Sequence, residues 1–159
     1  MVEIRNVTYE EKEKLGNLFE YYVYEFSPYL NIDVGMDGKF GFNQLEEYFT
    51  EFYDAYFIYR ENKIVGFCIV QRMDKYEYDF QIEQFFILKR YEGLGLGKAA
   101  AFQIFNQYKG RWNITQIETN YRAQAFWRGI IKSYTNNTFT EFYDDHRRSV
   151  QRFNNIKGE

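Results

Sequence analysis

A chain of 159 residues, 45% hydrophobic and 22% aromatic, is long enough for one domain with a substantial core, residues 1–159, and too short for two. Its net charge of −3 excludes a broad basic surface for nucleic acid or anionic membranes, and no apolar run approaches the roughly 20 residues of a membrane span. The single Cys68 and the single His146 exclude an internal disulfide and a cysteine- or histidine-rich metal centre. We expect a cytoplasmic protein, because residues 1–6 carry no apolar signal region.

The N-terminal residues predict a strand followed by an amphipathic helix. Apolar residues within 2–7 indicate the strand. Thr8 and Glu11 have the spacing of a capping box, and apolar residues then recur at helical spacing over 15–26. We expect this helix to end at Pro28, because proline disfavours helical geometry in the residue before it.

A long loop and a second helix are expected next. Residues 28–42 contain several Asn, Asp and Gly residues and predict a loop of roughly fifteen residues, a length that tends to be functional. Asn43 is placed to cap a second helix that runs through Tyr53, with Glu46 as its capping-box partner.

Three strands are predicted to form a meander in the middle of the chain. Residues 55–60 and 63–71 are rich in Tyr, Phe, Ile and Val and form a hairpin about residues 61–62. A turn near residues 74–77 leads into a third strand, residues 78–88. This strand leads directly into a glycine-rich turn.

The glycine-rich turn is the feature on which the functional interpretation depends. Alternating glycines allow positive φ and leave backbone N–H groups uncovered by side chains. A helix follows at once, with Ala101, Ile104, Phe105 and Tyr108 on one face. Because the start of a helix attracts negative charge, the sequence predicts a cradle for a phosphate or pyrophosphate, although a plain tight turn is the alternative. The predicted cradle comprises Gly93, Leu94, Gly95, Leu96, Gly97 and Lys98.

Two other glycine motifs fit the turn poorly. A Walker A loop needs a glycine five residues before Gly97 and a Ser or Thr after Lys98, where this chain has Glu92 and Ala99. A dinucleotide-binding fingerprint reads G-x-G-x-x-G, whereas this turn reads G-x-G-x-G. An NTPase and a nicotinamide-dependent oxidoreductase are therefore disfavoured.

The remaining residues predict one more strand, a helix and two closing strands. Residues 114–119 form the strand, and apolar residues at helical spacing over 123–134 form the helix. Residues 139–143 and 149–153 close the sheet.

The glycine turn resembles motif A of the GNAT family of N-acetyltransferases, in which Gln/Arg-x-x-Gly-x-Gly/Ala opens a helix after a strand. Glu92, Gly95 and Gly97 fill this pattern in the register that we prefer, and Arg90, Gly93 and Gly95 fill it in the other. In the preferred register Glu92 stands where the family has Gln or Arg.

The stretch from Asn120 to Trp127 resembles motif B of the same family, Asn-x-x-Ala-x-x-aromatic-aromatic after a strand. Trp127 stands where the family commonly has Tyr. The two motifs cover about the C-terminal half of the chain. The resemblance implies an α/β (α+β) fold with a mixed, mostly antiparallel central sheet, flanked by helices and splayed at the acetyl-CoA site.

The resemblance also implies transfer of an acetyl group from acetyl-CoA to a small-molecule or peptide amine in a ternary complex, by a monomer or homodimer. The strands would part at a bulge near residues 85–87, and the cradle would hold the pyrophosphate. The cofactor-binding residues that it implies outside the cradle are Phe85, Phe86, Ile87, Asn120 and Trp127.

Glu83 is the candidate base that would take the proton of the amine through a water molecule. Burial among Phe80, Phe85 and Phe86 would raise its pKa toward a useful value, and a backbone N–H near Phe86 would bind the carbonyl oxygen. Glu83 as a solvated or paired edge charge is the alternative.

An alternative mechanism is a ping-pong reaction with Cys68 as the nucleophile. Cys68 lies in an apolar stretch and is expected in the core, where no local base would activate it. Trp127 and Glu92 depart from the family pattern, which keeps open a non-catalytic module that binds CoA or another small ligand without turnover.

No dedicated acid is expected on the helix over 123–134 to protonate the CoA thiolate. The indole N–H of Trp127 is not a usable acid, and Tyr134 lies about 10 Å further along the helix, too far to replace it.

Overall fold

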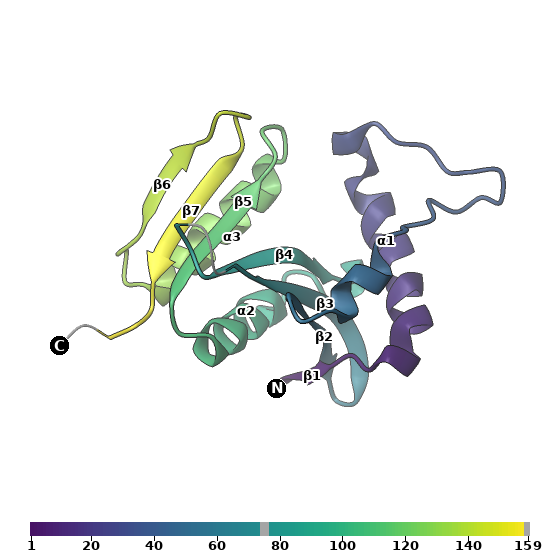
Figure 1. Cartoon of the computed structure of the whole chain (residues 1–159), viewed down its shortest axis with the longest axis horizontal. Coiled ribbons are helices and arrows are strands. Elements are labelled where there is room, and N and C mark those ends of the chain that lie inside the picture. Colours follow the sequence, from purple (N-terminus) through teal and green to yellow (C-terminus); the bar gives the residue numbers. More distant parts are fainter. Residues whose placement is uncertain (74–76, 158–159) are drawn as a thin grey trace.

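The computed structural model describes residues 1–73 and 77–157. Within these residues, seven strands form a sheet of order β1-β2-β3-β4-β5-β7-β6. Neighbouring strands are antiparallel apart from β4 and β5, which are parallel, so the predicted mixed and mostly antiparallel sheet is confirmed (Figure 1). The strands are β1 (Val2–Asn6), β2 (Tyr53–Arg60), β3 (Lys63–Arg72), β4 (Phe80–Ile87), β5 (Arg111–Gln116), β6 (Thr140–Tyr143) and β7 (Ser149–Asn154).

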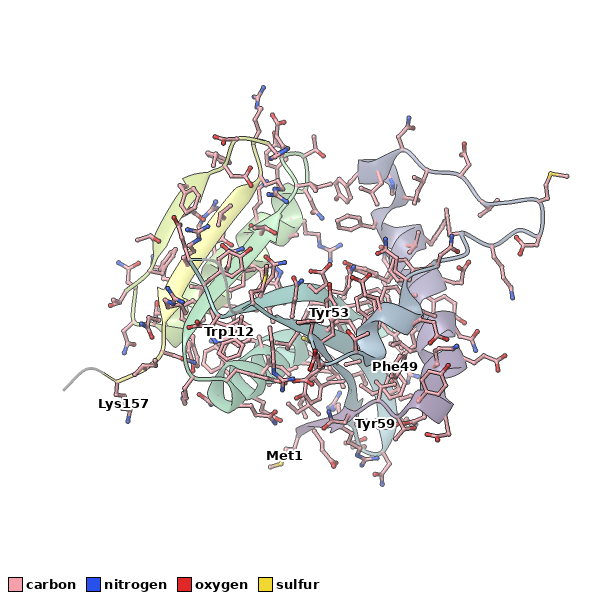
Figure 2. All side chains as sticks on the ribbon, in the orientation of Figure 1. Met1, Phe49, Tyr53, Tyr59, Trp112 and Lys157 are labelled. Atoms are coloured by element: carbon pink, nitrogen blue, oxygen red, sulfur yellow. The ribbon has the colours of Figure 1, made fainter. Side chains whose placement is uncertain are left out.

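Helices cover both faces of this sheet. The α-helices are α1 (Lys12–Leu30), α2 (Leu96–Gln107) and α3 (Tyr121–Tyr134), and the short 3-10 helices are η1 (Tyr9–Glu11), η2 (Leu45–Phe49) and η3 (Lys89–Tyr91). The side chains of β3 alternate between two cores. Phe67 packs under α1, where its ring stacks on Phe19 at 4.5 Å, whereas Cys68 faces the core beneath α2. Trp112, labelled in Figure 2, lies in that second core. Its ring centre is 4.9 Å from that of Phe105 on α2.

The start of α1 follows the prediction and its end does not. The Thr8 N–H donates to Glu11 Oε1 at 3.1 Å in the expected capping box. Pro28 lies inside the helix, which continues to Leu30, so the predicted end is wrong. Proline lacks the N–H that would reach the Tyr24 carbonyl, and the Ser27 hydroxyl donates to that carbonyl instead, at 2.8 Å.

The expected loop begins after α1 and extends away from the body of the domain (Figure 1). Its return is tied to α1, because the N–H groups of Phe40 and Gly41 donate to the Glu20 carboxylate at 2.8 and 2.9 Å. The expected helix over 43–53 is instead the short η2, because the chain must be extended again where β2 begins. Glu46 bonds to the Tyr9 hydroxyl at 3.0 Å rather than capping that helix.

Two further boundaries differ from the expectations. The strand expected over 114–119 is β5, which begins earlier because Trp112 and Asn113 are buried, and ends earlier because residues 117–119 lead into the cap of α3. The turn expected near 74–77 includes residues 74–76, which lie outside the described residues. In the part of the chain that the structure describes, no helix has the length and apolar character to cross a membrane.

Candidate active site

The site is a cavity of about 770 Å³ that opens where β4 and β5 part. The two strands pair at Phe80↔Trp112 and at Gln81↔Asn113, and beyond this short ladder they diverge (Figure 1). Residues from α1, the glycine turn and the start of α3 close the rest of the cavity. The splayed sheet expected from the resemblance is therefore present.

A β-bulge sits at Glu83. The register of β3 and β4 steps from Ile69↔Gln84 to Val70↔Ile82, so Glu83 is the extra residue on β4. The bulge expected near residues 85–87 thus lies earlier in the strand. An extra residue turns the strand and re-aims its side chains, which brings Glu83 to the cavity.

The surroundings of Glu83 differ from those expected. Burial raises the pKa of this carboxyl, a hydrogen bond from Gln81 at 3.1 Å lowers it, and the charge of Glu47 raises it. Phe80 and Phe85 pack into the α2 and α3 core on the opposite face, so the expected burial among them is wrong. The charge of Glu83 contributes to raising the pKa values of three nearby hydroxyls, those of Tyr22, Tyr48 and Tyr53.

The glycine turn has the backbone conformation that a cradle requires. Gly93 and Gly95 both have φ of +77°, and a Cβ added at either would meet nothing within 4 Å. Gly95 is the N-cap of α2, so the first N–H groups of that helix face open space able to accommodate an anion. Leu94 is 56% exposed, and it is not among the residues that line the cavity, although the sequence predicted it as part of the cradle.

Gly97 has a different reason to be glycine. A Cβ there would lie 2.8 Å from the ring of Phe126 on α3, so the missing side chain lets α2 and α3 approach one another. The remaining cradle residues Leu96 and Lys98 line the cavity. The turn therefore combines an open concave backbone with a close helix contact, and its residues fit a pyrophosphate group.

The other predicted cofactor residues also line the cavity. These are Phe85, Phe86 and Ile87 on β4, and Asn120 and Trp127 at α3. The Asn120 side chain accepts a hydrogen bond from the Ala123 N–H at 3.0 Å, which makes it the N-cap of α3. Trp127 is 6% exposed and meets the Phe85 ring edge-on at 4.9 Å, so its ring is part of the apolar wall.

The lining residues that the sequence reasoning missed include Arg122, part of α1, residues 114–117 and Arg148. Arg122, inside the motif B stretch, forms an ion pair of 2.6 Å with Glu92 at the edge of the cavity. On α1 the apolar stripe changes role along its length, from core at its start to cavity wall at its end. The wall residues of α1 are Tyr22, Glu25, Phe26 and Tyr29. Helical spacing reveals the stripe, but it cannot distinguish a core from a cavity wall.

Cys68 and the acidic side chains offer neither a nucleophile nor a metal centre in the described ranges. Cys68 is fully buried, and burial raises the pKa of its thiol above its ordinary value. Among residues 1–73 and 77–157, no group of three or more His, Cys, Asp or Glu side chains could hold a metal ion.

Comparison with known proteins places this geometry in a family. The family model for the acetyltransferase (GNAT) family matches residues 17–130. No curated protein matches the sequence. An acetyltransferase from Thermus thermophilus shares the fold, with 16% sequence identity, 97% of each chain covered and a TM-score of 0.66. A GNAT acetyltransferase from Staphylococcus aureus shares it with 18% sequence identity, 97% of this chain and 99% of that chain covered, and a TM-score of 0.63. The PaiA N-acetyltransferase from Thermoplasma acidophilum, in complex with coenzyme A, shares it with 12% sequence identity, 97% of this chain and 99% of that chain covered, and a TM-score of 0.62. With a splayed sheet, a glycine turn opening α2 and a family match over most of its length, the chain belongs to the GNAT acetyltransferase family.

Proposed function

We propose that the protein transfers the acetyl group of acetyl-CoA to a small-molecule or peptide amine within a ternary complex. The observation that carries the proposal is the shared cavity, which is lined by the glycine turn at Gly95 and Gly97 and also by Glu83. A cradle for an anion and a partly buried carboxylate in one space are what acetyl transfer from a phosphate-bearing donor requires. Acetyl-CoA supplies the activated acetyl group and a thiol leaving group.

Glu83 has the role of the base. An amine that arrives as an ammonium has no free electron pair, so it must lose a proton before it can attack. Burial raises the pKa of the Glu83 carboxyl, which makes it a better proton acceptor than an exposed glutamate. Its carboxylate takes the proton through a water molecule.

Backbone N–H groups of β4 have the role of binding the carbonyl oxygen. The Leu88 N–H donates to the Val65 carbonyl on β3 at 2.8 Å. Because N–H groups alternate in direction along a strand, those of Phe85 and Ile87 point away from β3, toward the side on which β4 and β5 part. These two N–H groups flank Phe86 and are suited to stabilise negative charge on the oxygen.

The thiol can leave without a dedicated acid on α3. Indole N–H of Trp127 is a donor but not an acid, and a thiol with a reference pKa near 8.5 departs as thiolate with modest help. The ring of Trp127 fills the apolar wall beside Phe85.

The deciding experiment measures thiol release from acetyl-CoA in the presence of a mixed amine library, for the parent and for Glu83→Gln. We expect amine-dependent release from the parent and a loss of roughly 100-fold or more in the variant. A protein that binds CoA but releases no thiol from acetyl-CoA with any amine of the library would be a non-catalytic binding module instead. A protein that CoA does not stabilise against heat would contradict the cradle itself.

A further inference from the structure

A continuous row of hydrogen bonds leads across three strands to Glu83. Arg152 Nε donates to Asn113 Oδ1 at 2.8 Å, Asn113 Nδ2 donates to Gln81 Oε1 at 3.0 Å, and Gln81 Nε2 donates to Glu83 Oε2 at 3.1 Å. Asn113 is the register partner of both Gln81 on β4 and Arg152 on β7, so the three side chains stand side by side on the sheet. The row crosses the sheet at the last rung before β4 and β5 part.

The cation at the start of this row favours one direction for its bonds, and the contact of Gln81 with Gln71 on β3 agrees with that direction. A guanidinium can only donate, so Arg152 requires the oxygen of the Asn113 amide and turns the NH₂ of that amide toward Gln81. Gln81 must then present its oxygen to Asn113, which leaves its NH₂ to donate to Glu83 and also to Gln71 Oε1 on β3, at 3.0 Å. The carboxylate therefore meets a donor rather than an amide oxygen.

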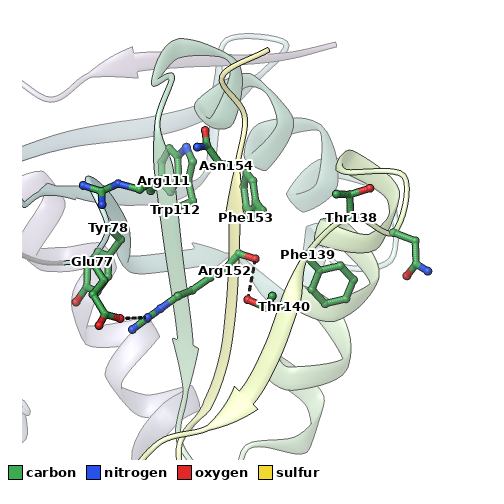
Figure 3. Close-up of a pocket in the computed structure, with 11 residues that line it drawn as sticks. Glu77, Tyr78, Arg111, Trp112, Thr138, Phe139, Thr140, Arg152, Phe153 and Asn154 are labelled. Carbon is green, nitrogen blue, oxygen red and sulfur yellow. Dashed lines mark hydrogen bonds and ion pairs between the residues drawn. The ribbon is translucent and has the colours of Figure 1, made fainter. Parts of the chain in front are cut away.

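The start of the row is held in place. Arg152 Nη1 donates to Glu77 Oε2 at 2.7 Å, the ion pair drawn in Figure 3. Its guanidinium carbon also lies 5.3 Å from the ring centre of Tyr78 and 5.0 Å from that of Phe142. Asn113 in the middle is 3% exposed, so turning its amide would leave buried polar atoms without partners.

We propose that Gln81 and Asn113 are positioning residues, which hold Glu83 as a hydrogen-bonded, ionisable carboxylate under the control of Arg152. This inference rests on the proposed function, in which Glu83 is the base. Because hydrogen bonds in series polarise one another, a change at Asn113 should reach Glu83 although the two side chains have Gln81 between them.

The other groups around Glu83 do not replace this donor. From α1, η2 and β2 the groups facing it are the hydroxyl of Tyr22, the carboxylate of Glu47, and the hydroxyls of Tyr48 and Tyr53. Burial and Glu47 both disfavour the ionised form, whereas the Gln81 N–H favours it. Loss or reversal of the Gln81 amide should thus raise the pKa of Glu83.

The test is the pKa of Glu83, measured by NMR titration of its carboxyl carbon in the full chain without acetyl-CoA and assigned with Glu83→Gln. Asn113→Asp still accepts from Arg152 but presents an oxygen to Gln81, so the Gln81 amide turns and its oxygen faces Glu83. We expect the pKa to rise by about 0.5 units or more, and the acidic limb of kcat/KM to move by the same amount. Gln81→Leu should act in the same direction.

Two further variants separate geometry from general damage. Arg152→Lys keeps the charge but loses the Nε donor, so we expect a smaller upward shift. Arg111 lies on β5, two residues before Asn113, and forms an ion pair of 2.9 Å with Asp79. Arg111→Gln removes this ion pair and should leave the pKa of Glu83 unchanged.

The role of this row of hydrogen bonds, here called the relay, would be overturned if the pKa of Glu83 stayed within about 0.2 units of the parent value in both Asn113→Asp and Gln81→Leu. If either variant unfolds, the titration of Arg152→Lys against Arg111→Gln decides, and equal pKa values in these two would also overturn it. A pKa that shifts in a protein that releases no thiol would support the relay and contradict acetyl transfer, so the two proposals fail separately.

Discussion

Arg122 of α3 and Glu92, the residue before the glycine turn, form an ion pair of 2.6 Å between Nη2 and Oε2 at the edge of the cavity. In the motif register that we prefer, Glu92 occupies the place where the family has Gln or Arg. Arg122 brings a positive side chain to the same place from a different element. An arriving phosphate would compete with Glu92 for this guanidinium, since both offer oxygen acceptors to it.

We expect Arg122→Ala to weaken CoA binding roughly tenfold, because it leaves Glu92 facing the phosphates without a cation. Glu92→Gln should bind CoA as well as the parent or better, since it frees Arg122 and removes a negative charge. Titration calorimetry measures both dissociation constants. Arg128→Ala is the control, because Arg128 lies on the same helix as Arg122 but pairs with Glu141 on β6. If Arg122→Ala bound CoA as tightly as this control, the prediction would be contradicted.

Gly95→Asp and Gly95→Asn form a matched pair at the cradle. Both place a side chain of one shape at φ of +77°, where a Cβ meets open space, so both should fold at a cost of about 1 kcal/mol. The Asp variant should lose stabilisation by CoA in a thermal-shift assay, because its carboxylate repels the pyrophosphate, and the Asn variant should retain part of it. Equal shifts in the two variants would place the phosphates elsewhere. Gly97 is less suitable, because any side chain there meets Phe126.

Glu83→Gln should change both the pH profile and the stability. Burial raises the pKa of Glu83 above its unfolded value, so the stability gained by protonation is full below the unfolded pKa and is lost as the pH rises through the folded pKa. The stability of Glu83→Gln relative to the parent should therefore increase as the pH rises from the unfolded pKa of a glutamate, about 4.3, through the higher folded pKa, measured by denaturant unfolding. In the same variant the acidic limb of kcat/KM should disappear. A pH-independent difference in stability would show that burial does not disfavour the ionised form of Glu83.

Tyr134→Phe should leave kcat within a few fold. The Tyr134 hydroxyl donates to Asn106 Oδ1 at 2.9 Å and accepts from Asn155 Nδ2 at 3.3 Å. Its ring centre lies 5.0 Å from that of Phe105, and Tyr134 is not among the residues that line the cavity. The loss of these two hydrogen bonds should cost about 1 kcal/mol of stability. Trp127→Tyr should be tolerated or mildly activating, because it restores a hydroxyl at the cavity. A fall of about 100-fold in kcat for Tyr134→Phe, with acetyl-CoA binding retained, would assign the acid to Tyr134.

Local patterns in the sequence determined most of the elements and the glycine turn. The hairpin turn falls at Glu61 and Asn62, which both adopt left-handed backbone conformations, and the glycine turn opens α2 as its composition predicts. These features depend on backbone preferences of neighbouring residues, so the sequence by itself contains the information. Where one hydroxyl replaced a missing backbone donor, as Ser27 does beside Pro28, the local rule failed.

Tertiary structure alone decided which side chains meet. Glu83 could be singled out as an acidic residue on a strand, but the bulge that aims it and the partners that surround it depend on the register of β3 against β4. Its link to Arg152 runs between residues far apart in sequence, through the rung that joins β4 to β5 and the next that joins β5 to β7. Strand register and helix placement result from the packing of the two cores as a whole, so periodicity in one segment cannot specify such contacts.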